Sequence, residues 1–252
     1  MGHRWEQRDE ATVAASVEEV WEAIATGPGI DSWFMGRSEV KPGPDGAVRT
    51  ATGSFTMDST ITGWEPPHRF AYRGAEGPDG RFFAYEYLVE GRGQGSTVVR
   101  VVANGFLPGD DWETEFEAMS LGGAMYFATL VAYLDHFAGR AGQSQSIDVS
   151  GPPVTDWPAA WAGLHQALGL SASPRVGDPA RVTIPGLPAI EGVVDFVNPQ
   201  AIGVRTPDAL YRFIRGFFGS IVLGHHIFRQ NTDADAAKAW LTWLNDLAPK
   251  EN

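Results

Sequence analysis

One long helix candidate constrains the fold of this chain more than any other segment. It covers residues 112–137, with the sequence WETEFEAMSLGGAMYFATLVAYLDHF. Asp110 or Asp111 is expected to cap its start, and Gly139 is expected to end it. Alternating steps of three and four residues place an apolar stripe along one face, and such a stripe needs a large partner surface. The stripe consists of Trp112, Phe116, Met119, Gly123, Tyr126, Leu130, Tyr133 and Phe137.

Two adjacent glycines, Gly122 and Gly123, interrupt this helix at its middle. Together they cost about 2 kcal/mol of helix stability relative to alanine. Gly123 lies on the apolar stripe and Gly122 lies beside it. We therefore expect that a strand approaches the helix closely at this level or that the space is left for a ligand.

The segment before the long helix predicts a strand, two short helices and about six antiparallel strands. Ser16 and Glu19 form a capping box at the start of the first helix, and Ile30 to Phe34 is expected to form a second helical turn. In residues 82–90, Phe83, Tyr85, Tyr87 and Val89 alternate with the other face, as in a half-buried strand. A meander with so many aromatic side chains on one face is expected to curve around the long helix. The predicted class is therefore α+β.

Three segments together resemble a known superfamily. They are SVEEVWEAIATGPGIDSWF at 16–34, WEPPHRFAYR at 64–73 and STVVRVVANGF at 96–106. Their order resembles the START/polyketide-cyclase (SRPBCC) superfamily, in its branch of homologues of the activator of heat-shock-protein-90 ATPase, over residues 4–140. The residues that carry the first match are Val20, Trp21, Ile24, Trp33 and Phe34.

The resemblance implies the helix-grip fold, in which a curved antiparallel sheet wraps a long C-terminal helix around a cavity. A hydrophobic ligand in that cavity would contact apolar side chains and the tyrosine hydroxyls. The alternative is that the same aromatic side chains simply fill a core. The candidate ligand-binding residues are Trp33, Phe55, Phe70, Tyr72, Phe83, Tyr85, Tyr87, Val99, Met119, Gly123, Tyr126 and Leu130.

The remainder of the chain predicts a second, smaller α+β domain. Residues 1–140 form the first domain, residues 141–153 are rich in Gly, Ser and Gln and are expected to be a linker, and residues 154–252 form the second domain. The second domain is expected to contain a helix, several short strands and a final amphipathic helix. This order is a shortened form of the first, which favours a degenerate helix-grip repeat over an unrelated α+β extension, and both interpretations stay open.

Composition excludes several classes of function. The net charge of −12 and the lack of a Lys/Arg cluster argue against nucleic-acid binding and against docking on anionic membranes. The absence of cysteine excludes disulfides and thiolate chemistry. No histidine stands at metal-ligand spacing from another, so no metal or cofactor is expected. No apolar run is long enough for a membrane span, and the N-terminus has no signal-peptide pattern, so the protein is expected to be cytoplasmic.

Three functions remain, and binding of a small hydrophobic or aromatic molecule is the first. The second is a cyclase, dehydratase or hydrolase, with Tyr85, Tyr87, Glu86 or Tyr126 as polar donors; no catalytic residue is assigned. Alternation along its strand places Glu86 on the face opposite Tyr85 and Tyr87, toward solvent. The third is a protein-interaction module similar to a co-chaperone. The C-terminal domain is a candidate interface for a homodimer or a protein partner.

Overall fold

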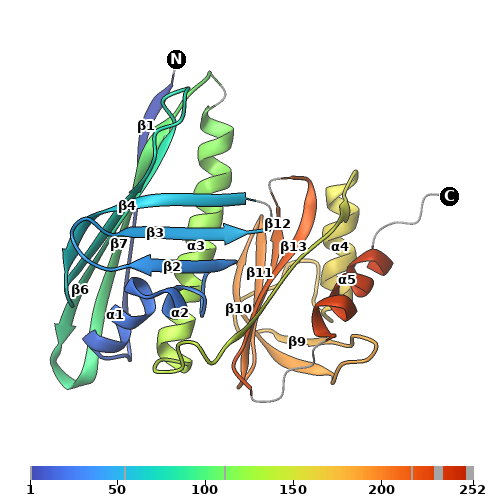
Figure 1. Cartoon of the computed structure of the whole chain (residues 1–252). Helices are drawn as coiled ribbons and strands as arrows, with labels where there is room; N and C mark the ends of the chain where they lie inside the picture. The colour runs from blue at the N-terminus through green and yellow to red at the C-terminus, as the bar shows by residue number, and fades with distance from the viewer. Residues whose placement is uncertain (1, 54, 111, 217, 230–234, 248–252) are drawn as a thin grey trace. The chain divides into compact units, whose positions relative to one another are not determined.

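The computed structural model describes residues 2–53, 55–110, 112–216, 218–229 and 235–247. The chain divides into two compact units, Met1–Gln143 and Ser144–Asn252, called unit 1 and unit 2 below. Figure 1 shows the elements of both units. In the described residues, none of the helices combines the length and the apolar character that crossing a bilayer requires.

Unit 1 has the predicted order of strand, two helices, strands and long helix. Its strands are β1 (His3–Val13), β2 (Arg37–Lys41), β3 (Ala47–Thr52), β4 (Phe55–Glu65), β5 (Arg69–Gly74), β6 (Phe82–Arg92) and β7 (Ser96–Leu107). Its helices are α1 (Val17–Ala25), α2 (Gly27–Ile30) and α3 (Trp112–His136), with a 3-10 turn at Gly93–Gly95.

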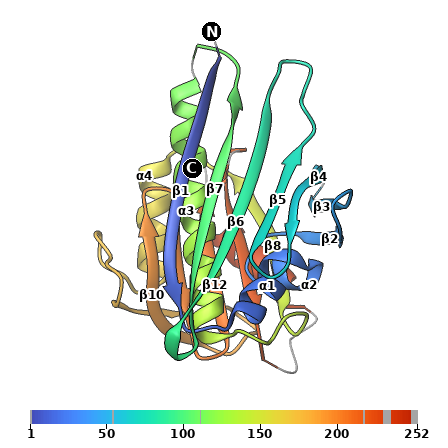
Figure 2. The ribbon, with the colours of Figure 1, turned by 90° about the vertical axis from the view of Figure 1, so that its left-hand side faces the viewer.

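The strands of unit 1 form one antiparallel sheet in the order β1-β7-β6-β5-β4-β3-β2. The helix α3 packs against β1 and β7, and Figure 2 shows these strands side by side along it. The N–H of Ala14, at the end of β1, donates to Oδ1 of Asp135 in α3 over 2.8 Å. The arrangement confirms the helix-grip fold.

The short helices begin at the residues that can cap them. Ser16 Oγ accepts the N–H of Glu19 over 3.2 Å, and Glu19 Oε2 accepts the N–H of Ser16 over 2.8 Å, which completes the predicted capping box. The second helix covers Gly27–Ile30, whereas the sequence placed it at Ile30 to Phe34. It starts earlier because Thr26 Oγ1 accepts the N–H of Gly29 and because proline suits the first turn of a helix.

The apolar stripe of α3 has two parts. In the C-terminal half, Leu130, Tyr133 and Phe137 are buried, whereas Phe116 and Met119 in the N-terminal half stay partly exposed.

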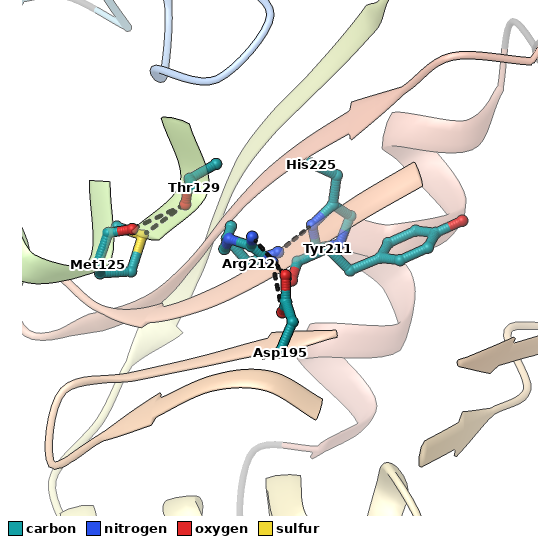
Figure 3. A network of polar contacts seen from close by, with 6 residues as sticks. All are labelled: Met125, Thr129, Asp195, Tyr211, Arg212 and His225. Atoms are coloured by element: carbon teal, nitrogen blue, oxygen red, sulfur yellow. Dashed lines mark hydrogen bonds and ion pairs between the residues drawn. The ribbon is translucent and has the colours of Figure 1, made fainter. Parts of the chain in front are cut away.

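Within α3, Thr129 Oγ1 donates to the carbonyl oxygen of Met125 over 2.8 Å (Figure 3). The positive φ of +74° at Gly139 agrees with the predicted end of the helix. Asp111, one of the two predicted caps, lies outside the described residues.

Unit 2 repeats the topology of unit 1. Its elements are β8 (Gln145–Pro153), α4 (Trp157–Ala167), β9 (Pro179–Val182), β10 (Ile190–Asn198), β11 (Ala201–Arg205), β12 (Ala209–Arg215), β13 (Ser220–Ile227) and α5 (Ala236–Leu247). Its sheet order is β8-β13-β12-β11-β10-β9. In each unit the first strand pairs with the last, helical segments follow the first strand, and a helix follows the last strand. In the described residues, unit 2 has one strand fewer and a shorter final helix. The strand order that the two units share confirms the repeat.

The segment expected as a linker, residues 141–153, contains a strand. Residues 145–153 form β8, which pairs with β13 at the edge of the second sheet. Ile147 is 2% exposed and belongs to the core of unit 2. The prediction was wrong because an edge strand tolerates proline and polar residues, and these obscured the alternation of Ile147 and Val149, which both pack on the core of unit 2.

A charged pair lies in the sheet of unit 2 (Figure 3). Arg212 donates to both carboxylate oxygens of Asp195, over 3.0 and 2.9 Å. The side chains of Arg212 and Asp195 are 2% and 11% exposed. A Cβ atom on Gly203, between these residues in the sheet, would lie 2.6 Å from Asp195 Oδ1 and 2.7 Å from Arg212 Nη1. The pair therefore depends on a glycine at this position.

His225, on β13, lies on the face of this sheet that is opposite the charged pair, and its side chain is inside the core of unit 2. Its Nδ1 accepts the backbone N–H of Arg212 over 3.1 Å, so the ring proton of the neutral form is on Nε2. The rings of Trp240, Tyr211 and Phe213 lie 4.4, 4.9 and 5.2 Å from the imidazole. Burial, and then the charges of His226 and Arg212, lower the pKa of His225 well below 6.5. The imidazole is therefore a neutral part of the core.

Candidate functional site

The face of the first sheet that packs on α3, called the inner face below, is built from rows of residues across neighbouring strands. Strand pairing sets these rows, since opposite residues on adjacent strands point to the same side. One row contains Gln7, Ala103, Tyr85 and Tyr72, the next contains Asp9, Val101, Tyr87 and Phe70, and a third contains Trp5, Gly105 and Phe83. The inner face thus combines aromatic rings, polar groups and two small residues.

Three tyrosines form a cluster on β5 and β6. The ring of Tyr72 lies 5.4 Å from that of Tyr85 and 6.4 Å from that of Tyr87. The hydroxyls of Tyr72 and Tyr87 are hydrogen-bonded to each other. Burial raises the pKa of all three phenols above the ordinary value of 10. The hydroxyls are therefore neutral at pH 7 and can donate or accept hydrogen bonds.

Alkaline titration should reveal this burial. Burial also raises the pKa of Tyr133 and Tyr211 to about 12, so five of the six tyrosines are affected. Because the unfolded chain ionises first, the contribution of these groups to stability is present below pH ~10 and is lost as pH rises further. Phenolate absorbance at pH ~10 should stay far below the half-ionisation of free tyrosine. Half-ionisation in a chain that circular dichroism shows to be folded would contradict the buried cluster.

Polar groups of β1 meet the middle of α3. Gln7 Nε2 donates to Asp9 Oδ2 over 3.0 Å and lies 3.5 Å from the carbonyl oxygen of Ser120. A Cβ atom on Gly123 would lie 3.3 Å from Gln7 Oε1, whereas one on Gly122 would meet nothing within 4 Å. Close approach of a strand side chain thus explains Gly123, while Gly122 borders open space.

Aromatic rings lie on both sides of this polar group. The ring of Trp5 is 6.2 Å from that of Phe83 and 5.8 Å from that of Phe116 in α3. Further along the helix, the ring of Tyr126 is 4.3 Å from that of Phe34, which follows α2. These contacts connect the sheet, α3 and the segment after α2 around one region.

The structure places the twelve predicted ligand-binding residues in three groups. Trp33, Phe70, Tyr87, Val99 and Leu130 are buried. Tyr72, Phe83, Tyr85, Met119, Gly123 and Tyr126 are partly accessible. Phe55 is 65% exposed, so its assignment to an interior site was wrong. It shares the inward alternation of β4 but is the first residue of that strand, at the end of the β3–β4 hairpin, where no other layer covers it.

Glu86 points to the outer face, as predicted from the alternation of its strand. Arg69 Nε donates to Glu86 Oε1 over 2.6 Å, and Arg69 Nη1 donates to Glu65 Oε1 over 2.8 Å. Glu86 is therefore held in a surface ion pair on the outer face and has no role at the inner face.

Sequence reasoning missed four site residues: Trp5, Gln7, Asp9 and Ser120. The only signal for the three on β1 was that they lie an even number of residues from the buried Val13 and therefore on the same face of the strand.

The inner face can hold a molecule by apolar contact and orient it through neutral hydroxyls, an amide and a carboxylate. Within the described parts of the chain, no three His, Asp or Glu side chains are grouped so that they could bind one metal ion. The chemistry available is hydrogen bonding, apolar packing and proton transfer through Asp9 or the tyrosines.

Residues 4–131, just over half of the chain, match the family model described as polyketide cyclase/dehydrase and lipid transport. The chain belongs to this family. The match covers the sheet of unit 1 and most of α3, and it confirms the resemblance to the START/polyketide-cyclase superfamily. The finer assignment to the branch of heat-shock-protein-90 ATPase activator homologues stays a prediction. No curated protein matches the chain.

Solved structures similar to this family member match either nearly the whole chain or about half of it. The di-domain ARO/CYC BexL of the BE-7585A biosynthetic pathway is 13% identical, with a TM-score of 0.47, and the match covers 98% of this chain and 100% of BexL. DynU16, from the dynemicin biosynthetic locus, is 18% identical, with a TM-score of 0.43 and 96% of each chain covered. MLL2253 from Mesorhizobium loti is 19% identical, with a TM-score of 0.46, and the match covers 53% of this chain and 98% of that protein.

Proposed function

We propose that unit 1 binds a small hydrophobic or aromatic molecule between the inner face of its sheet and α3. The observation that carries the proposal is the combination of buried tyrosine hydroxyls with inner-face side chains that stay partly accessible. Tyr72 and Tyr85 are partly exposed even though burial raises the pKa of both phenols. Their rings are therefore reachable although their hydroxyls are withdrawn from bulk water.

The small residues of β7 support the same proposal. Ala103 lies between Gln7 and Tyr85 in one row, and Gly105 lies between Trp5 and Phe83 in another. The strip over Ala103 thus has little side-chain volume, whereas the indole of Trp5 covers Gly105, where an added Cβ atom would lie 3.0 Å from Trp5 Nε1. A flat molecule over this strip would contact rings at both ends and polar groups along its edge. The family description includes lipid transport, which requires an apolar binding site.

Fluorescence titration with the neutral probe N-phenyl-1-naphthylamine tests the proposal on the full chain. We expect saturable binding, and we expect Ala103→Leu to weaken it at least tenfold because the leucine fills the strip. Val102→Leu, on the opposite face of the same strand, is the matched control and should bind like the parent. Unsaturable binding, or equal affinity of the two leucine variants, would rule out a site on the inner face.

A cyclase-type reaction is the second candidate, since a carboxylate and several hydroxyls share the inner face. Asp9 could accept a proton from a carbon between two carbonyl groups, and a tyrosine hydroxyl could stabilise the resulting enolate oxygen. The test is a synthetic poly-β-keto thioester, whose aldol condensation forms one carbon–carbon bond and releases one water. A cyclised product that Asp9→Asn reduces at least tenfold would support this candidate, and an unchanged substrate would leave ligand binding alone.

A further inference from the structure

The indole N–H of Trp5 is buried without a hydrogen-bond partner among the described residues. Trp5 is 9% exposed and packs between Phe83 and Phe116. A Cβ atom on Gly105 would lie 3.0 Å from Trp5 Nε1, so the glycine leaves space for this edge of the indole. An indole N–H can only donate, and buried donors are nearly always paired in native proteins. The missing partner must therefore be an acceptor.

The hydroxyl of Ser120 is a second buried group that has no partner in the described part of the chain. Ser120 lies one helical turn after Phe116, the residue that packs on Trp5. A serine within a helix commonly bonds to the carbonyl four residues earlier, and Ser120 makes no such bond. Gln7 Nε2, 3.5 Å from the Ser120 carbonyl oxygen, places the same turn of α3 against β1. Two unpaired polar groups thus lie at one junction of β1 and α3.

We propose that Trp5, Gln7 and Ser120 form a hydrogen-bonding subsite, called the oxygen subsite below, that takes a carbonyl oxygen of the bound molecule. This inference rests on the proposed ligand site of unit 1 and specifies its chemistry. Trp5 and Ser120 supply the two unpaired donors, and Gln7, whose Nε2 donates to Asp9 Oδ2 and to the Ser120 carbonyl oxygen, holds this turn of α3 against β1 beside them. Because leaving these donors unpaired is unfavourable, the subsite selects a ketone over a hydrocarbon of the same shape.

The rows of the sheet also limit the shape of that molecule. Gln7 and Tyr85 share a row with Ala103 between them, so two strand spacings, roughly 10 Å, separate their backbones. A planar system of two or three fused rings spans this distance. Its carbonyl would occupy the oxygen subsite, and its far edge would reach the tyrosine cluster.

Calorimetric titration of the full chain with 9-fluorenone and with fluorene tests the oxygen subsite. The two probes have the same fused rings and differ by the carbonyl. We expect fluorenone to bind at least tenfold more tightly, and we expect Trp5→Phe to reduce this preference to less than threefold because it keeps the ring and removes the donor. Ser120→Ala should reduce the preference as well. Trp161→Phe, in α4 of unit 2, is the control and should keep the parental preference.

A second readout separates a ligand contact from a purely structural role of Trp5. In a nitrogen–proton correlation spectrum of the tryptophan indoles, the Trp5 signal is the one absent from Trp5→Phe. Fluorenone should shift this signal downfield, and fluorene should not. Equal affinity for both probes, with no selective shift, would overturn the oxygen subsite and leave the ligand site standing. Binding of neither probe would overturn both.

Discussion

Replacing Asp195 by alanine is expected to lower the free energy of unfolding of unit 2 by about 3–5 kcal/mol. The change removes the two carboxylate oxygens that accept from the Arg212 guanidinium, whose side chain is 2% exposed, while Arg212 Nη1 still donates to the carbonyl oxygen of Tyr211 over 3.1 Å. The remaining cation would stay buried without its counter-ion, and this penalty exceeds the attraction lost from a surface pair. Urea unfolding of the full chain measures the cost, and amide hydrogen exchange in β10 and β12 assigns it to unit 2.

The matched control lies on the same strand. Glu191 on β10 pairs with Arg181 over 3.4 Å, but these side chains are 68% and 69% exposed. Glu191→Ala should therefore change the free energy of unfolding by no more than about 1 kcal/mol. A cost for Asp195→Ala as small as that of the control would show that water reaches the guanidinium of Arg212. In that case the pair would be a surface interaction.

The geometry of this pair could not be predicted from the sequence. Strand pairing between β10 and β11 shifts by one residue between Val194 and Phe196, so Asp195 lies in a bulge. Simple alternation along the strand therefore gives the wrong side for part of it. Gly203 then leaves the space that the carboxylate and the guanidinium share. The bulge, and the approach of Asp195 and Arg212 to Gly203, depend on neighbouring strands, and local sequence patterns do not record them.

The fold itself followed from local patterns because many of them agreed. The capping box at Ser16, the alternation of Phe83, Tyr85 and Tyr87, and the helical spacing before Gly139 each specify one element. Short connections then limit how these elements can be arranged. The repeat in unit 2 was predictable for the same reason, since its order of helix and strands copies that of unit 1.

The candidate site was predicted only where polarity distinguished the two faces of a strand. In β6, aromatic residues occupy the inner face, so the tyrosines could be assigned. In the middle of β1, Gln7 and Asp9 alternate with Arg8 and Glu10, and both faces are polar. Only the structure shows that Gln7 contacts α3 whereas Glu10 pairs with Arg100 on the outer face. The assignment of Phe55 to the site was wrong for a related reason. Alternation gives the face of the sheet on which a side chain lies, but it does not show whether another layer covers that face.

Replacing Gly123 by leucine is expected to lower the affinity for 9-fluorenone at least tenfold. A Cβ atom at this position already lies 3.3 Å from Gln7 Oε1, and the remaining atoms of leucine would displace the Gln7 amide or occupy the ligand space. Leucine is also the better helix former, by about 1 kcal/mol relative to glycine. Helix content in far-ultraviolet circular dichroism should therefore stay the same or rise while binding is lost.

Gly163→Leu in α4 separates these two effects. It replaces another glycine within a helix, at which an added Cβ atom would meet nothing within 4 Å, and it lies in unit 2. It should gain the same helix propensity and keep the parental affinity. If Gly123→Leu also bound fluorenone normally, α3 would be a core helix whose glycine serves only the approach of Gln7. The space beside it would then hold no ligand, and the proposal for unit 1 would fail at its central residue.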